Sequence, residues 1–179
     1  MILESYGIKL ARVEEEDAEL LRSWRNDPKI TQYMNFREYI TEDMQKKWFA
    51  SINNDSNYFF IIEFQQEKLG LTEIKKIDRS TRSAESGIYI YSDRFLHTML
   101  PYQVIFTLLD FAFFKLNLEY INAYILKNNK RAIRFNKSLG FVPDEYQEYE
   151  EKQLYVLKKD AYINQTTRTK NIVNKELSE

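Results

Sequence analysis

Short runs of alternating apolar and polar residues, together with short continuous apolar runs, occur throughout the chain and predict strands. Two of them, Tyr58–Phe64 and Leu69–Ile77, are separated only by polar residues and are typical of a β-hairpin. Because successive strand residues face opposite sides of a sheet, each run can bury at least one face in a core. The pattern predicts strands at residues 7–13, 58–64, 69–77, 84–91, 120–126, 141–142 and 153–158.

Between these strands, apolar residues recur at helical spacing. Thr41 is a suitable N-cap, Pro101 suits a first helical turn, and Gly140 is placed to end a helix in a left-handed conformation. The spacing predicts helices at residues 17–26, 42–52, 101–116 and 129–139.

The expected order is therefore β α α β β β α β α β β, with no internal repeat and no linker that would divide it. Residues 1–160 are expected to form one domain, which is long enough to bury a core. Residues 161–179 are polar and weakly patterned, so a flexible C-terminal tail is expected.

Composition removes several classes of chemistry. The 179 residues include no cysteine, one histidine (His97) and four widely spaced glycines. Glycine-rich phosphate and dinucleotide loops need clustered glycines, and His/Cys metal sites need more of those ligands, so neither is expected. With 26 basic and 27 acidic residues, the chain lacks the basic excess of a nucleic-acid binder.

Membrane insertion is not expected either. The longest apolar stretch, Val104–Phe114, is too short to span a bilayer, and the N-terminal sequence shows no secretory signal. We expect a cytoplasmic protein.

The strand-to-helix connection Ser92–Leu100 is a candidate anion site. A strand feeding a helix leaves free backbone N–H groups at the positive end of the helix dipole. Arg94, His97 and Thr98 in this loop can also bind phosphate. An ordinary connection without a ligand is the alternative.

The segments around this loop resemble a known family. NKRAIRFNKSLGF (129–141) fits the pattern N-x-x-A-I-x-x-x-x-x-L-G-F of the GNAT N-acetyltransferase superfamily, and AESG (84–87) and KLGLTEIKKID (68–78) are similar to its preceding strands. LRSWRNDPKITQYM (21–34) resembles the branch of ribosomal-protein, polyamine and nucleotide-amino-sugar acetyltransferases. The resemblance covers residues 6–160. It implies an α/β (α+β) fold: a mixed, mostly antiparallel sheet flanked by helices and splayed at its central strands.

The resemblance also implies acetyl-CoA as the cofactor. Its pantetheine arm would follow Tyr89, Ile90 and Tyr91, and Asn129 would contact it. Asn129 is also a good N-cap, and the two roles are compatible. The pyrophosphate would lie on the loop formed by Leu96, His97, Thr98 and Met99.

Direct transfer to an amine is the implied reaction. Glu85 and Glu73 are the candidate bases, although surface solvation or a cross-strand ion pair with a lysine is the alternative for each. Asn136 stands where many members carry a tyrosine that protonates the leaving thiolate, and its amide can donate a hydrogen bond but is no acid. The side of the acceptor, which is the amine substrate, would carry Trp24, Arg25, Asn26 and Trp48. The two tryptophans are alternatively core anchors.

The expected acceptor is a small-molecule amine, with a nucleotide-linked amino sugar first and a polyamine or protein N-terminus next. A homodimer is possible in this family. The loop lacks the family's glycines, and a residue forced into a left-handed conformation there would lose roughly 1–2 kcal/mol. A degenerate domain that binds partners without transferring acetyl groups is therefore the competing interpretation.

Overall fold

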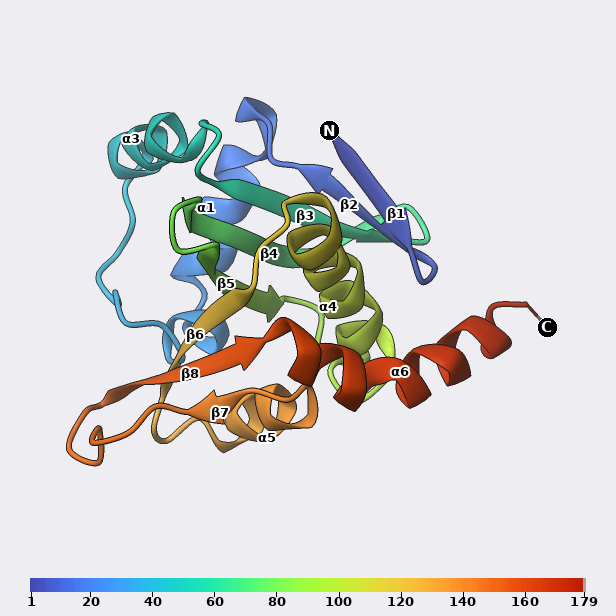
Figure 1. The fold of residues 1–179 in the computed structure, drawn as a ribbon. Helices are drawn as coiled ribbons and strands as arrows, with labels where there is room; N and C mark the ends of the chain where they lie inside the picture. Colours follow the sequence, from blue (N-terminus) through green and yellow to red (C-terminus); the bar gives the residue numbers. More distant parts are fainter. Residues whose placement is uncertain (179) are drawn as a thin grey trace.

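The computed structural model describes residues 1–178 and contains one open sheet (Figure 1). Its strand order is β1-β2-β3-β4-β5-β6-β8-β7, and every neighbouring pair is antiparallel except β5 and β6. The mixed, mostly antiparallel sheet expected from the sequence is confirmed. The strands are β1 (Ile2–Ser5), β2 (Ile8–Arg12), β3 (Tyr58–Phe64), β4 (Glu67–Asp78), β5 (Ser83–Ile90), β6 (Tyr120–Leu126), β7 (Val142–Pro143) and β8 (Lys152–Lys158).

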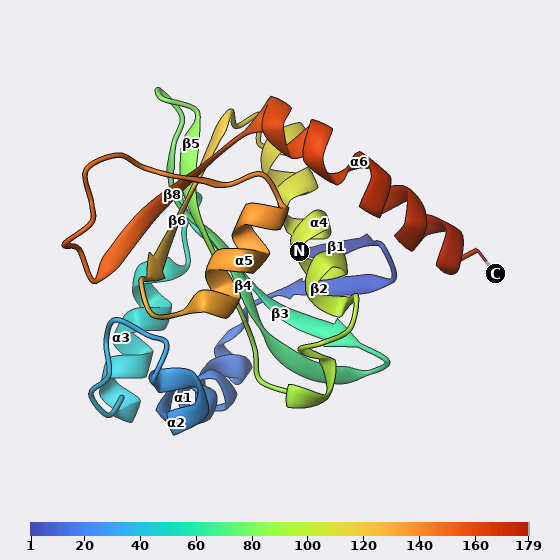
Figure 2. The same ribbon diagram turned by 90° about the horizontal axis from the view of Figure 1, so that it is seen from below.

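Helices cover both faces of the sheet, as the view from below shows (Figure 2). The sheet face beneath α4 and α5 holds the larger core, and the face beneath α1 and α3 holds a second, smaller one. The helices are α1 (Ala18–Asn26), α2 (Pro28–Thr31), α3 (Glu42–Ile52), α4 (Leu100–Asp110), α5 (Lys130–Ser138) and α6 (Lys159–Glu176).

Local sequence explains several of these boundaries. Thr41 caps α3 by accepting a hydrogen bond from the N–H of Met44, as its position predicts. Asp27 caps α2 in the same way, with Pro28 at the first position of that helix. A π-helical turn at Phe111–Lys115 extends α4.

One strand near the N-terminus was not predicted. The expected strand at 7–13 corresponds to β2, but β1 precedes it and pairs with it through a turn at Tyr6 and Gly7. Both turn residues have positive φ, 52° and 72°. Glycine adopts that conformation freely, whereas Tyr6 does so at a cost, so the residue types alone did not indicate the hairpin.

The flexible tail expected at residues 161–179 is wrong for residues 161–176, which belong to α6, whereas Glu179 lies outside the described residues. Tyr162 is completely buried, and Thr166 and Val173 on the same face are buried with it. The Tyr162 hydroxyl donates to Asp110 of α4 at 2.8 Å, and Lys170 donates to the same carboxylate at 2.5 Å. The pattern escaped detection because these few anchoring residues are separated by polar ones.

The sheet separates at its centre. β5 pairs with β6 only where residues 83–85 face residues 120–122. Beyond Glu85, β5 and β6 no longer pair with each other. β5 continues to pair with β4, and β6 continues to pair with β8. The predicted splay between the central strands is confirmed, and it places a cavity within the sheet.

Candidate active site

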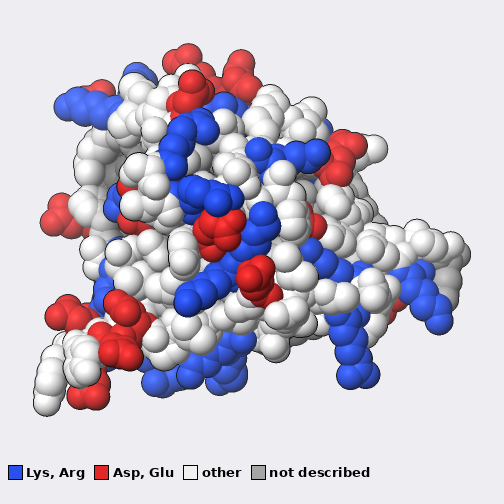
Figure 3. All heavy atoms as spheres, in the orientation of Figure 1, with Lys and Arg blue, Asp and Glu red and all other residues white. Residues whose placement is uncertain are grey.

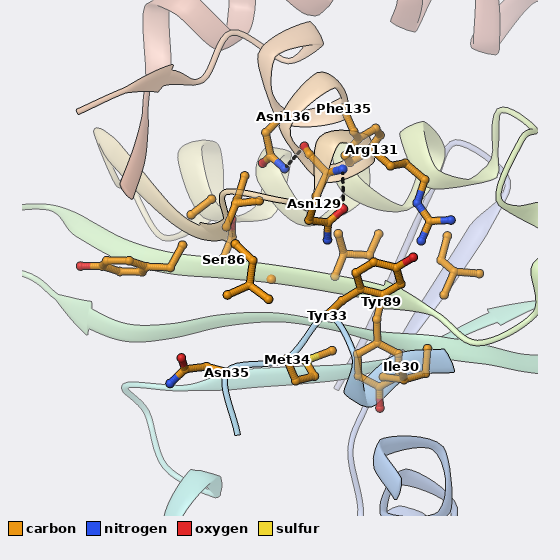
Figure 4. A pocket seen from close by; sticks show the side chains of 18 of the residues that line it. Ile30, Tyr33, Met34, Asn35, Ser86, Tyr89, Asn129, Arg131, Phe135 and Asn136 are labelled. Carbon is orange, nitrogen blue, oxygen red and sulfur yellow. Dashed lines mark hydrogen bonds between the residues drawn. The ribbon is translucent and has the colours of Figure 1, made fainter. Parts of the chain in front are cut away.

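A cavity of about 530 Å³ lies where β5 and β6 part. Figure 4 shows Asn129, the N-cap of α5, and Asn136 within that helix on one wall and the segment after α1 on the other, with β5 between them. From that segment, Tyr33 and Met34 reach the cavity. The cavity therefore joins three parts of the chain that are far apart in sequence.

The main chain of β5 borders this cavity with unpaired groups. Tyr91 donates its N–H to the Leu69 carbonyl of β4 at 2.7 Å. Main-chain groups of successive residues alternate between the two sides of a strand. Those of Ser86, Ile88 and Ile90 consequently face the gap toward β6. A ligand with amide groups along an extended arm would satisfy this row of donors and acceptors.

A second cavity of about 390 Å³ adjoins the first on the α3 side. Glu73 and Glu85 lie between the two cavities, with side chains only 14% and 16% exposed. Each carboxylate has a lysine partner: Lys75 binds Glu73, and Lys76 lies 2.7 Å from Glu85. The residues that line both cavities are Arg25, Glu73, Lys75, Glu85 and Lys152.

The comparison with known proteins decides the family. A model of the acetyltransferase (GNAT) domain matches residues 8–142. The chain belongs to the GNAT acetyltransferase family. It is an acetyl-CoA-dependent acyltransferase by this membership, and the row of unpaired groups on β5 fits the amide-bearing arm of that cofactor.

Relatives of this GNAT acetyltransferase differ in what they act on. This chain is 27% identical to the acetyltransferase PseH of Campylobacter jejuni over 138 residues. The match covers 75% of this chain and 84% of PseH. The spermidine N-acetyltransferase of Vibrio cholerae, in complex with CoA and spermine, has a TM-score of 0.79 at 23% identity and covers 89% of this chain and 100% of its own. Apo FdhC, a nucleotide-linked sugar GNAT, has a TM-score of 0.77 at 21% identity, and the match covers 94% of this chain and 96% of FdhC. The two structures show the fold they share with this chain.

The acetyltransferase brings only part of the expected cofactor loop to the cavity. Leu96 lines it, whereas His97, Thr98 and Met99 do not. Met99 packs against the larger core, and the Thr98 hydroxyl accepts a hydrogen bond from the N–H of Leu100 at 3.2 Å. The loop closes on itself at these positions.

No residue of this loop has a positive φ. The expected left-handed strain from the missing glycines is therefore wrong: the chain turns with ordinary angles. The loop does so through short-range bonds, in which Phe95, Leu96 and Thr98 donate their N–H groups to carbonyls within Ser92–Phe95. Fewer N–H groups are then free for an anion than the sequence suggested.

The two asparagines of α5 both line the cavity. Asn129 accepts a hydrogen bond from the N–H of Ala132 at 3.1 Å, so it is the N-cap of the helix, and its amide nitrogen points into the cavity (Figure 4). Asn136 donates its side-chain N–H to the Ala132 carbonyl at 2.9 Å. This bond uses one of the two N–H donors of the Asn136 amide, so its second N–H and its oxygen can still bind a ligand.

Of the three residues expected along the cofactor, Tyr89 and Ile90 at the end of β5 line the cavity, and Tyr91, which follows the strand, does not. The Tyr91 hydroxyl donates to Asp27 at 2.9 Å, and its ring stacks on Trp24 with centroids 5.3 Å apart. The hydrogen bond to Asp27 raises the pKa of Tyr91. The pKa of Asp27 is lowered, mainly by the hydrogen bond from the N–H of Lys29 and also by the bond from Tyr91. Tyr91 thus fastens β5 to α2.

The expected acceptor residues separate into two groups. Arg25 lines both cavities and Trp48 lines the second. Trp24 is 5% exposed in the smaller core, so the structure gives it the anchoring role. Asn26 lines neither cavity and instead holds the main chain of Ile40.

Sequence reasoning missed the basic residues of the site. Lys75 and Lys76 stand on β4, Lys152 on β8 and Arg131 on α5, where the guanidinium lies 5.6 Å from the Tyr33 ring. Strand alternation could have placed Lys75 beside Glu73, but only the fold brings β8 there. Together the cavities are lined by six basic and three acidic side chains. The basic ones are Arg25, Lys29, Lys75, Lys76, Arg131 and Lys152, and the acidic ones are Glu73, Glu85 and Asp93.

The outer surface differs from the cavities in its distribution of charged side chains. On the face shown in Figure 3, basic and acidic side chains are interspersed, and acidic ones gather at the loop between β7 and β8. That face carries no broad basic surface of the kind that binds nucleic acid. Among the described residues, no helix is long and apolar enough to cross a membrane, and no cluster of His, Asp or Glu is placed to hold a metal.

Proposed function

We propose that the protein transfers the acetyl group of acetyl-CoA to a primary amine of a small molecule carrying negative charge, with a nucleotide-linked amino sugar as the first candidate. The observation that carries the proposal is the meeting of the β5 gap with a second cavity at Glu73 and Glu85. Acetyl-CoA would supply a thioester at the gap. The protein would hold the amine beside it, so that proximity provides much of the rate.

In this proposal the chain's own residues hold the reactants and move a proton. Main-chain groups of Ser86, Ile88 and Ile90, with the Asn129 amide, would bind the pantetheine arm. Glu73 or Glu85 would accept the proton of the incoming ammonium group, directly or through water. Each carboxylate is held in place by a lysine partner, Lys75 for Glu73 and Lys76 for Glu85.

The charge of the cavities supports an anionic acceptor over a polyamine. A polyamine carries several positive charges and prefers an acidic cleft. The lining has twice as many basic as acidic side chains, and each of the two central carboxylates already has a lysine partner. A nucleotide-linked sugar carries phosphates, which such a lining attracts. A protein N-terminus offers no such group and is the weaker candidate.

Calorimetry with acetyl-CoA, followed by mass spectrometry of candidate amines, tests the proposal. We expect saturable binding of acetyl-CoA and acetylation of an amino sugar linked to a nucleotide. Absence of binding at millimolar acetyl-CoA would instead support the alternative of a degenerate binding module, and faster acetylation of spermidine would support the polyamine reading. We also propose a homodimer in the cytoplasm, which light scattering and cell fractionation would test.

A further inference from the structure

Two buried polar atoms lie without a partner at one place in the site. Among the described residues, only Arg25 Nε and Tyr89 Oη are buried side-chain nitrogen or oxygen atoms with no hydrogen-bond partner. Both residues line the larger cavity. Leaving a buried polar group unpaired costs free energy, and such groups commonly mark the position of a ligand.

The surroundings of the two atoms show what kind of ligand they suit. Arg25 has no ion pair in the described part of the chain, whereas the nearby Glu73 is bound by Lys75. An Nε–H group can only donate a hydrogen bond. Burial is the main cause that raises the pKa of Tyr89, with Glu73 also raising it and Arg25 opposing them. The phenol therefore keeps its proton and can also donate.

We propose that Arg25 and Tyr89 form a subsite for a phosphoryl oxyanion of the acceptor. Two neighbouring donors, one of them a cation, match the several acceptor oxygens of a phosphate. This inference rests on the proposed function and names the group by which its acceptor is recognised. It also separates the phosphorylated acceptor from a polyamine, which would place further positive charge beside Arg25.

The spacing along β5 fits such an acceptor. Glu73 lies over Gly87, its partner across the strands, and Tyr89 follows two residues later on the same face. Two residues of strand span about 7 Å. Along the strand the two positions are thus about one sugar ring apart, which suits an amine held at Glu73 and an oxyanion held at Tyr89. A sugar with its amine on the ring and its phosphate on the anomeric carbon has this arrangement.

Calorimetry with uridine diphosphate on the full chain tests the subsite apart from catalysis. We expect Tyr89→Phe to weaken binding about 10-fold to 150-fold, as for the loss of one hydrogen bond to a charged group. Arg25→Gln should weaken it more, and Arg25→Lys should fall between wild type and Arg25→Gln because it keeps the charge but loses the Nε–H. Tyr146→Phe and Arg168→Gln, both on exposed side chains outside the cavities, are the matched controls and should leave binding unchanged.

A thermal melt separates this role from a structural one. Removing a hydroxyl that has no partner in the free protein should leave the melting temperature of Tyr89→Phe unchanged or raise it, while binding falls. The subsite is wrong if uridine diphosphate binds equally to wild type, Tyr89→Phe and Arg25→Gln, or if wild type acetylates an amine but does not bind uridine diphosphate. Failure to bind acetyl-CoA would instead overturn the proposed function. Binding of glucuronate in place of uridine diphosphate would assign the subsite to a carboxylate and contradict the phosphate.

Discussion

Glu73 lies directly over Gly87 on the neighbouring strand, so that a Cβ at position 87 would meet Glu73 Oε1 at 2.8 Å. The absence of a side chain at Gly87 is what allows this carboxylate to lie flat on the sheet between the two cavities. The AESG segment thus matters for the shape of the acceptor side as well as for the strand that borders the gap.

Gly87→Ala should lower activity much more than stability. The methyl group would displace the Glu73 carboxylate, which is the end of a flexible side chain and can move at little cost. Misplacing a general base removes part of its typical contribution of about 10²–10⁴-fold, so we expect kcat/KM to fall at least tenfold with a nearly unchanged melting temperature. Gly70→Ala is the contrasting variant: its Cβ would lie 2.2 Å from the Tyr89 carbonyl oxygen, and both quantities should fall.

The two candidate bases can be told apart by Glu73→Gln and Glu85→Gln. The variant that removes the base should lose about 10²–10⁴-fold in kcat, because the amine must then lose its proton to water. The measurement is kcat for acetyl transfer over a range of pH. Glu63→Gln, which breaks a similar ion pair with Lys9 on β2, should retain wild-type kcat. Full activity in both cavity variants would remove the carboxylates from the mechanism.

A bulky residue at position 96 should block the cofactor. Leu96 lines the gap and its neighbour His97 does not, so Leu96→Trp and His97→Trp form a matched pair. We expect Leu96→Trp to weaken acetyl-CoA binding more than tenfold by calorimetry, while His97→Trp binds like wild type. Equal effects of the two substitutions would show that the cofactor does not pass this point.

The turn that leads into β5 should respond to acid. Asp78 accepts hydrogen bonds from the N–H and hydroxyl of Ser80 and from the N–H of Thr81, and these lower its pKa to about 2 from its usual 3.8. Because the folded pKa is depressed, the stabilisation is complete above about pH 4 and is lost as the pH falls toward 2. The melting temperature of Asp78→Ala should be below that of wild type at neutral pH, and the difference should shrink over this interval. A difference that stays constant down to pH 2 would contradict this assignment.

Much of the sheet and most of the helices followed from the sequence pattern, because short runs rich in aromatic and β-branched residues, such as Tyr58–Phe64, are typical of strands. The N-terminal hairpin did not, since its turn depends on a positive φ at Tyr6, which no residue preference favours. α6 did not either, because its stability comes from contacts with Asp110 about fifty to sixty residues earlier. Local pattern carries no information about such distant partners.

The site was predictable where one strand or helix sufficed. Asn129 at the start of α5, and Glu73 and Glu85 on paired strands, stand where the sequence placed them. The loop after β5 was not predictable in detail, because its short-range hydrogen bonds replace the glycine-rich conformation expected there. Nor was the positive lining, since Lys152 and Arg131 reach the cavities from elements that only the fold brings to β5.

The C-terminal helix α6 connects the two parts of the sheet that lie on either side of the gap between β5 and β6. The two halves of the sheet are joined by three residue pairs between β5 and β6. α6 begins directly after β8 in the second half and runs to the first half, where Leu177, the residue after the helix, lies beside the turn at Gly7. None of its described residues lines the gap, so this link between the two halves of the sheet lies outside the site.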